Sequence, residues 1–395
     1  MKQAIQCHNR YNMNIILILI CCLCLNIGKA FAEEALPTND KTSSATHQDD
    51  ATHQAEEEFQ AEDFQEWAFF PVIASETETG LQLGGLAVRF FKPESNEFRT
   101  STIDFVAFGT VNQQYYTGVT SDFYLKRDLY HLNLTANGRF WPANFYGIGN
   151  DTTEEDKKLF ESTGLDTRIV FERKFIDLLY AGVLYKFRNS WIEPESPESE
   201  GVLQNESLTG AEGGLRSGLG ITLSLDTRDN VNDARDGTFI KADALYFEDS
   251  FGSDFDYSLY TLDMRQFITL ARVTGLGIRG YVQLMRGDIP FQDLSSPNGY
   301  NILRGLENGR YRDRDMIAFQ AEWRFPIYKR FGGTVFMETA QVAEDLSDIH
   351  NDGWTSGAGV GLRYAINYSE KFNTRIDFSW VDGGFGLTIG MREAF

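Results

Sequence analysis

Seven charged side chains follow one another closely near the end of the chain, between two apolar stretches. Leu303-Arg304-Gly305-Leu306 is followed by further charges and then by an alternating apolar stretch from Met316; the other six charges are Glu307, Arg310, Arg312, Asp313, Arg314 and Asp315. A guanidinium removed from water requires a carboxylate, and its planar fork binds one through two parallel hydrogen bonds. The segment therefore predicts ion-pair chemistry, centred on Arg304.

Other patterns that could support catalysis or ligand binding lack the necessary context. Residues 275–280 match a dinucleotide fingerprint by letter, but they lie in an alternating strand with no helix after it. Residues 348–353 resemble half of a calcium loop, but Gly359 stands where the bidentate Glu belongs. No G-x-S-x-G occurs, and no motif places a nucleophile beside a histidine. We therefore expect no enzymatic activity, no cofactor and no metal site.

The first 32 residues have the three parts of a secretory signal peptide. Basic residues precede an apolar run from Met13 to Leu25, and Ala30-Phe31-Ala32 supplies the cleavage site. All four cysteines fall within this leader, which excludes a disulfide scaffold from the mature chain. Residues 33–66 hold eleven acidic residues and one Lys, and we expect them to form a disordered acidic tail.

The charge of the mature chain limits its partners. Removing the three basic residues of the leader from the 36 in the chain leaves 33 against 57 acidic residues, a net charge of −24. Such a balance argues against binding to nucleic acid. Because 14% of residues are aromatic, 36 are Gly and no stretch reaches 18 apolar residues, the composition favours a β-barrel of the outer membrane.

From residue 67 to 395 the hydrophobic pattern has a period of two. Phe319, Ala321 and Trp323, for example, alternate with Gln320, Glu322 and Arg324. The pattern predicts an all-β fold, a 16-stranded antiparallel transmembrane β-barrel, with strands near 67–75, 79–92, 98–111, 113–126, 127–140, 164–174, 178–191, 213–227, 237–249, 255–271, 274–288, 315–327, 331–345, 355–368, 372–382 and 384–394. Both ends would then lie on the side of the short turns, and the long loops would face the exterior.

One predicted outer loop, residues 191–212, carries six Glu and no Lys or Arg. A solvated acidic loop explains this composition, and divalent-cation bridging to lipopolysaccharide is the alternative. Outer-membrane lipid and lipopolysaccharide are therefore the expected surroundings of the barrel.

Four motifs in this order resemble the BamA/TamA family of outer-membrane proteins, also called the bacterial surface antigen family. They are residues 145–150 (FYGIGN), 226–230 (DTRDN) leading to Gly237-Thr238, 303–306 (LRGL) and 322–326 (EWRFP). The resemblance covers roughly residues 67–395. It implies that the loop after the eleventh strand folds into the lumen, where its arginine pairs with acids on the following strands. Arg304 would then pair with Glu322 and Glu338, although the family usually has Asp at the latter position.

Gly305 would let the backbone turn tightly against the barrel wall. The alternative is that Arg304 lies in a solvated outer loop, with a surface ion pair worth at most about 1 kcal/mol. Residues 33–66 show no pattern of the compact periplasmic domains that protein-inserting family members carry, so we expect a barrel-only member. A separate periplasmic partner protein is one way to supply such domains.

The last predicted strand is amphipathic and ends at Phe395, which resembles the signal that the bacterial barrel assembly machinery recognises. Pro71 in the first strand lacks a ladder donor, and Gly384, Gly386 and Gly390 in the last strand pack poorly. A seam between these strands could open sideways. The resemblance implies a role in outer-membrane biogenesis, by insertion or translocation of protein or lipid; the alternative is a passive or gated channel, since sixteen strands enclose a wide lumen.

Overall fold

The computed structural model describes residues 66–76, 79–93, 98–195, 201, 208–271, 274–367 and 371–395. The predicted signal peptide and nearly all of the predicted acidic tail lie outside these residues, as does part of the acidic loop 191–212. No helix within the described ranges is long and apolar enough to cross a membrane.

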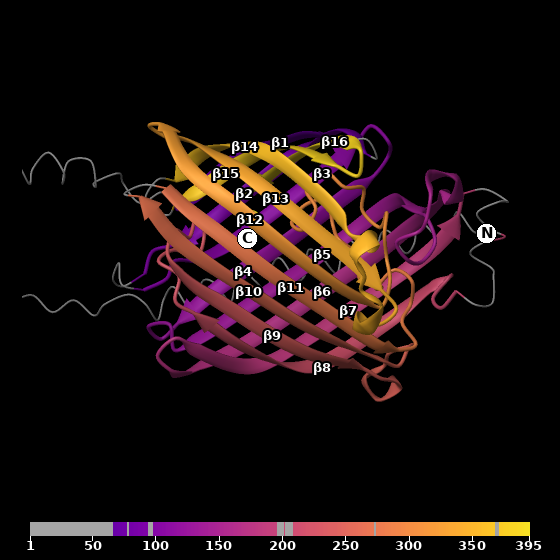
Figure 1. Ribbon diagram of the computed structural model, residues 1–395. Coiled ribbons are helices and arrows are strands. Elements are labelled where there is room, and N and C mark those ends of the chain that lie inside the picture. Colours follow the sequence, from indigo (N-terminus) through magenta and orange to yellow (C-terminus); the bar gives the residue numbers. More distant parts are fainter. Residues whose placement is uncertain are drawn as a thin grey trace, which may run out of the picture.

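Sixteen strands pair with their sequence neighbours in one antiparallel sheet, which curves into a barrel of tilted strands (Figure 1). The strands are β1 (Trp67–Glu76), β2 (Gly80–Phe91), β3 (Ser101–Thr110), β4 (Tyr115–Leu125), β5 (Tyr130–Phe145), β6 (Lys158–Ile176), β7 (Leu179–Pro194), β8 (Gly213–Asp226), β9 (Gly237–Phe247), β10 (Tyr257–Ala271), β11 (Thr274–Gly287), β12 (Asp315–Tyr328), β13 (Phe331–Ala343), β14 (Thr355–Asn367), β15 (Phe372–Val381) and β16 (Gly384–Met391). The predicted fold class is confirmed.

The period-two pattern separates the two faces of the wall. On β12, Phe319 and Trp323 are 48% and 45% exposed, whereas Glu322 between them is completely buried. Large apolar side chains therefore cover the outside, and charged side chains line the inside. An apolar band outside and a polar interior are what a barrel in a membrane requires.

Most predicted strand limits agree with the structure to within a few residues, but the limits of β5 and β6 were wrong. β5 runs to Phe145 instead of 140 and β6 begins at Lys158 instead of 164, because their ladder continues from Trp141↔Ser162 to Phe145↔Lys158. The outer loop between them therefore shortens to residues 146–157. The last strand is also shorter than predicted and ends at Met391 instead of 394.

The longest connections lie at one end of the barrel and most of the tight turns at the other, with exceptions such as residues 227–236 and 382–383. Residues 126–129, 177–178 and 329–330 are tight turns at the end where both β1 begins and β16 finishes. The longest described connection, residues 288–314, belongs to the other end, and we call it the lumenal loop because it folds inward. Its Ile302, Leu303 and Leu306 are buried against inner side chains of β12 and β13. The loop thus fills part of the barrel interior.

Candidate functional site

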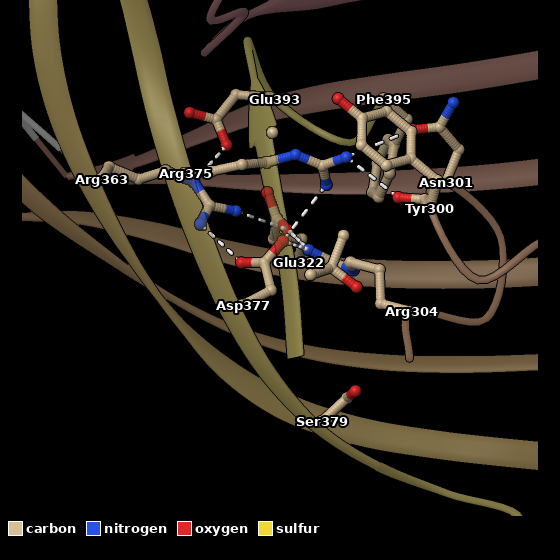
Figure 2. A network of polar contacts seen from close by, with 12 residues as sticks. Tyr300, Asn301, Arg304, Glu322, Arg363, Arg375, Asp377, Ser379, Glu393 and Phe395 are labelled. Carbon is tan, nitrogen blue, oxygen red and sulfur yellow. Dashed lines mark hydrogen bonds and ion pairs between the residues drawn. The ribbon is translucent and has the colours of Figure 1, made fainter. Parts of the chain in front are cut away.

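Three carboxylates from the wall hold Arg304 at the tip of the lumenal loop, and Figure 2 shows two of them, Glu322 and Asp377. The Nη1 of Arg304 donates to Glu322 Oε2 at 2.6 Å and to Asp377 Oδ2 at 3.2 Å, and its Nε donates to Glu338 Oε1 at 2.7 Å. Its main-chain N–H donates to the second oxygen of Glu338 at 2.7 Å. The guanidinium carbon lies 3.4 Å from the ring centre of Phe336, so an aromatic face covers the group.

Burial and charge act in opposite directions on Arg304. The side chain has no exposed surface, and burial lowers the pKa of the guanidinium, but Glu322 and Glu338 more than offset this and raise the pKa above its ordinary value. Arg304 is therefore a permanent cation in the lumen. A solvated outer loop, the alternative weighed from the sequence, does not describe its position.

Gly305 and Gly386 explain how the loop approaches the wall so closely. Gly305 has φ +85°, and a Cβ on either glycine would overlap the backbone of the other strand or loop. Nearby, Thr388 Oγ1 donates to Gly299 O at 3.2 Å, and a Cβ on Gly390 would lie 2.6 Å from the Tyr300 hydroxyl. The inner face of β16 is therefore shaped to accept residues 299–305. Gly386 and Gly390 are occupied by this packing, which revises the prediction that they pack poorly.

The carboxylates around Arg304 continue into a larger charged network on β12, β14 and β15 (Figure 2). Glu322 also pairs with Arg324 at 2.8 Å, and Asp377 pairs with Arg363 at 2.6 Å and Arg375 at 3.1 Å. Arg363 further pairs with Glu393 at 2.6 Å. Four arginines thus face four acids, which are Glu322, Glu338, Asp377 and Glu393, and Arg324 also lies 3.7 Å from Asp233, so each buried charge has an opposite partner.

A second anchor fixes the beginning of the lumenal loop to another part of the wall. Asp293 pairs with Arg188 of β7 and, at 3.4 Å, with Arg216 of β8, and it accepts a hydrogen bond from the Tyr257 hydroxyl at 2.6 Å. Burial raises the pKa of the Asp293 carboxyl, but the arginines prevail and hold its pKa below the usual range. The lumenal loop therefore contributes a carboxylate, Asp293, to one side of the lumen and a guanidinium, Arg304, to the other.

The structure brings together four of the residues singled out from the sequence: Arg304, Gly305, Glu322 and Glu338. Asp377 was missed, although it lies on the polar face of a strand that the alternation predicts, between Arg375 and Ser379. Asp293 was missed because a single Asp in a loop carries no signal of its partners. Pro71 pairs with Gly85 in the β1–β2 ladder, and Gly384 begins β16 beside its turn.

The seam between the first and last strands lacks a backbone ladder in the described part of the chain, although β1 and β16 are in contact (Figure 1). Side chains bridge it instead. Phe90 of β2 and Phe372 of β15 meet edge to face at 5.7 Å across the seam, and Arg392, just after β16, pairs with Asp104 of β3 at 3.1 Å. The barrel is therefore nearly closed, with closure supplied by side chains.

Phe395 does not lie on an extended last strand, as its place in the alternation had suggested. Arg392 has φ +60°, and the chain turns there into the lumen. Phe395 is 6% exposed and stacks on Phe267, and its carbonyl oxygen accepts a hydrogen bond from Arg324 at 2.7 Å. Its role as an assembly signal stays a prediction.

A sixteen-stranded antiparallel barrel with an apolar exterior, charged lumen and in-folded Arg-Gly loop defines an integral outer-membrane β-barrel. The chain belongs to the Omp85 superfamily, since residues 93–381 match the Omp85 superfamily domain. The resemblance to BamA and TamA is thereby confirmed, and the barrel is located in the outer membrane. No curated protein matches the sequence.

Two solved structures illustrate the similarity in fold. BamA from Haemophilus ducreyi lacking POTRA domains 1–3 is 10% identical, with a TM-score of 0.53 over 82% of this chain and 69% of that one. CdiB from Acinetobacter baumannii is 11% identical, with a TM-score of 0.54 over 82% of this chain and 59% of that one. These likenesses show the fold.

Proposed function

We propose that the chain acts in outer-membrane biogenesis by passing a protein strand or a lipid sideways through the seam between β1 and β16. The lumenal loop holds the barrel closed in the resting state. The observation that carries this proposal is the combination of a seam without a ladder and a loop tip packed on the inner face of β16. No enzymatic chemistry is assigned to the barrel.

The unpaired edges of β1 and β16 provide the chemistry for a protein client. An exposed strand edge presents a row of free N–H and C=O groups, which an incoming strand can pair with. Unsatisfied edge groups are costly in a membrane, so a seam without a ladder favours pairing with an incoming strand. The side-chain contacts Phe90–Phe372 and Arg392–Asp104 are separable without breaking any ladder.

Engineered disulfides across the seam test the proposal. Residues 33–395 contain no cysteine, so a pair placed at positions 69 of β1 and 387 of β16, with neighbouring registers as a panel, reacts without competition. A cross-linked seam should abolish the protein's contribution to outer-membrane integrity in growing cells, and a reductant should restore it. The matched control joins β15 to β16 at the paired positions Phe378 and Leu387. Full activity of the cross-linked seam would exclude lateral opening.

A passive or gated channel is the second candidate function, because a barrel of sixteen strands is wide enough for an aqueous lumen. The lumenal loop argues against large steady currents, since its Leu303 and Arg304 are buried inside the barrel. Conductance of the purified protein in planar bilayers distinguishes the two functions. Large currents from the intact chain, unchanged after deletion of residues 289–314, would favour the channel.

The proposal also includes partners. The barrel assembly machinery would insert this chain, and a periplasmic protein would deliver the client. Co-purification from mildly solubilised membranes identifies such a protein, and a variant that lacks the lumenal loop serves as the control for contacts made through the lumen.

A further inference from the structure

A cavity in the lumen lies beside the Arg304 network, against the inner faces of β6, β7, β9, β10 and β11; its Asp263 is linked to Glu338 through Arg279 and Gln320. Its volume is about 280 Å³, and its charged lining residues are Arg168, Lys186, Lys241, Asp243 and Asp263. Leu184, Leu245 and Leu259 complete one end, where they belong to the apolar cluster that packs against Ile289 and Leu294 of the lumenal loop. The loop therefore caps the cavity on the long-loop side.

Lys186 is placed among like charges. It lies directly opposite Arg168 in the β6–β7 ladder, and Arg188 is two residues further on the same face of β7. Like charges in directly opposite positions destabilise a sheet unless a negative group separates them. Arg168 has Asp243 at 3.0 Å, and Arg188 has Asp166 and Asp293. Lys186 forms no ion pair or hydrogen bond with any described residue, and Asp166 and Asp293 act on it only from beyond ion-pair distance.

The two carboxylates of the cavity are already engaged by arginines. Asp263 receives two hydrogen bonds each from Arg265 and Arg279, between 2.6 and 3.1 Å. Asp243 accepts from Arg168 through Oδ2, while its Oδ1 is buried and has no hydrogen-bond partner. The cavity thus offers an ammonium group without an ion pair and a carboxylate oxygen without a donor. Both deficits are expensive in a confined space unless a bound group satisfies them.

We propose that this cavity binds a small phosphate-type oxyanion that also carries a hydroxyl group. Negative oxygens pair with Lys186 and relieve its repulsion with Arg168, and the hydroxyl donates to Asp243 Oδ1. Hydrogen phosphate is the simplest member of this class, and the cavity has room for it together with several waters of ~30 Å³ each. The chemistry is shared by free phosphate and by the phosphate monoester of a lipid headgroup.

Isothermal titration calorimetry of the purified, detergent-solubilised protein tests the site with two ligands. Inorganic phosphate represents the free anion, and short-chain phosphatidic acid represents the lipid. Binding of either should weaken at least tenfold in Lys186→Met and recover in Lys186→Arg. Lys329→Met removes an exposed lysine from the β12–β13 turn and should leave the affinity unchanged. Sulfate, which has no donor for Asp243 at neutral pH, should bind more weakly than phosphate.

The pattern of binding identifies the ligand. Saturable binding of phosphate assigns the free anion, and binding of phosphatidic acid alone assigns the lipid headgroup. Heat-modifiable migration on gels verifies that each variant has folded as a barrel. Absence of saturable binding by both ligands, or binding that Lys186→Met leaves unaltered, would overturn the proposal.

Discussion

Replacement of Arg304 by Met should release the lumenal loop. The three carboxylates that bind Arg304 differ in how many other partners they keep. Glu322 keeps Arg324 at 2.8 Å, and Asp377 keeps Arg363 at 2.6 Å and Arg375 at 3.1 Å. Among the described residues, Glu338 keeps only the Gln320 amide, at 2.9 Å, as a side-chain partner. Removal of one partner from a buried ion pair costs roughly 3–5 kcal/mol because a charge remains uncompensated. We expect the lower figure, since the main-chain N–H of residue 304 still reaches Glu338.

A cost of roughly 3 kcal/mol increases the population with a detached loop about 100-fold, at 1.36 kcal/mol for each factor of ten. Proteinase K digestion of the membrane-embedded protein, followed by mass spectrometry, measures the rate of cleavage within residues 288–314. That rate follows the detached population when detachment is fast relative to cleavage. Trypsin is unsuitable because the substitution itself removes a tryptic site.

Two variants make the result interpretable. Arg314→Met removes an arginine of the same loop that has no ion pair in the described structure, so its cleavage rate should stay at the wild-type value. Arg304→Met combined with Glu338→Gln should recover part of the protection, because an amide needs no counter-charge; the two changes are coupled through one contact. If Arg304→Met is as resistant as the wild type, the ion pairs do not hold the loop.

The second anchor, the packing on β16 and the seam each give a further expected outcome. Asp293→Asn should increase cleavage of the loop. In the wild type, the pKa of the Asp293 carboxyl is lower in the folded state than in the unfolded state, where it is about 4. The stabilisation by Asp293 is therefore complete above about pH 4 and is lost as the pH falls below that value, and pepsin digestion from pH 5 to 2 measures this loss. Gly386→Val should displace the loop, whereas Gly384→Val, where a Cβ meets nothing closer than 3.6 Å, should not; the same protease assay compares them. Arg392→Met should lower the unfolding temperature in heat-modifiability gels only slightly, because its partly exposed pair with Asp104 is worth at most about 1 kcal/mol.

Each of these outcomes has an opposite that contradicts it. Equal cleavage of the Asp293→Asn and wild-type proteins at neutral pH would mean that the second anchor is not used. Protection that persists unchanged to pH 2 would mean that another contact replaces the carboxylate. A loop that stays protected in Gly386→Val would show that the wall yields at that position.

The strand number was predictable because each strand alternates between lipid and lumen along its whole length. The same property explains the errors at β5 and β6, since alternation does not distinguish a strand inside the membrane from its extension above it. Glu322 and Glu338 were predictable partners because they lie on the two strands that follow the loop. Asp377 was not, because it depends on how the closed barrel brings β15 beside a loop that begins at β11.

The glycines of β16 illustrate a different limit. From the sequence, Gly386 and Gly390 indicate only a strand that packs weakly. Their actual neighbours, Gly305 and Tyr300, are more than 80 residues away in the chain and cross the lumen to reach them. Asp293 and its arginines likewise come together only in the folded barrel, because the arginines lie on β7 and β8 and Asp293 lies in the lumenal loop.

The placement of residues 299–305 couples two properties of the barrel that could otherwise vary separately. This stretch contacts Glu338 on β13, Asp377 on β15 and the glycines of β16 at the same time. Displacing the lumenal loop from the lumen therefore also removes the packing on the inner face of β16, the last strand at the seam. A ligand that enters the lumen and displaces the lumenal loop would therefore also loosen β16 at the seam. Binding inside the barrel and opening toward the lipid would be coupled through this one stretch of chain, without a separate hinge.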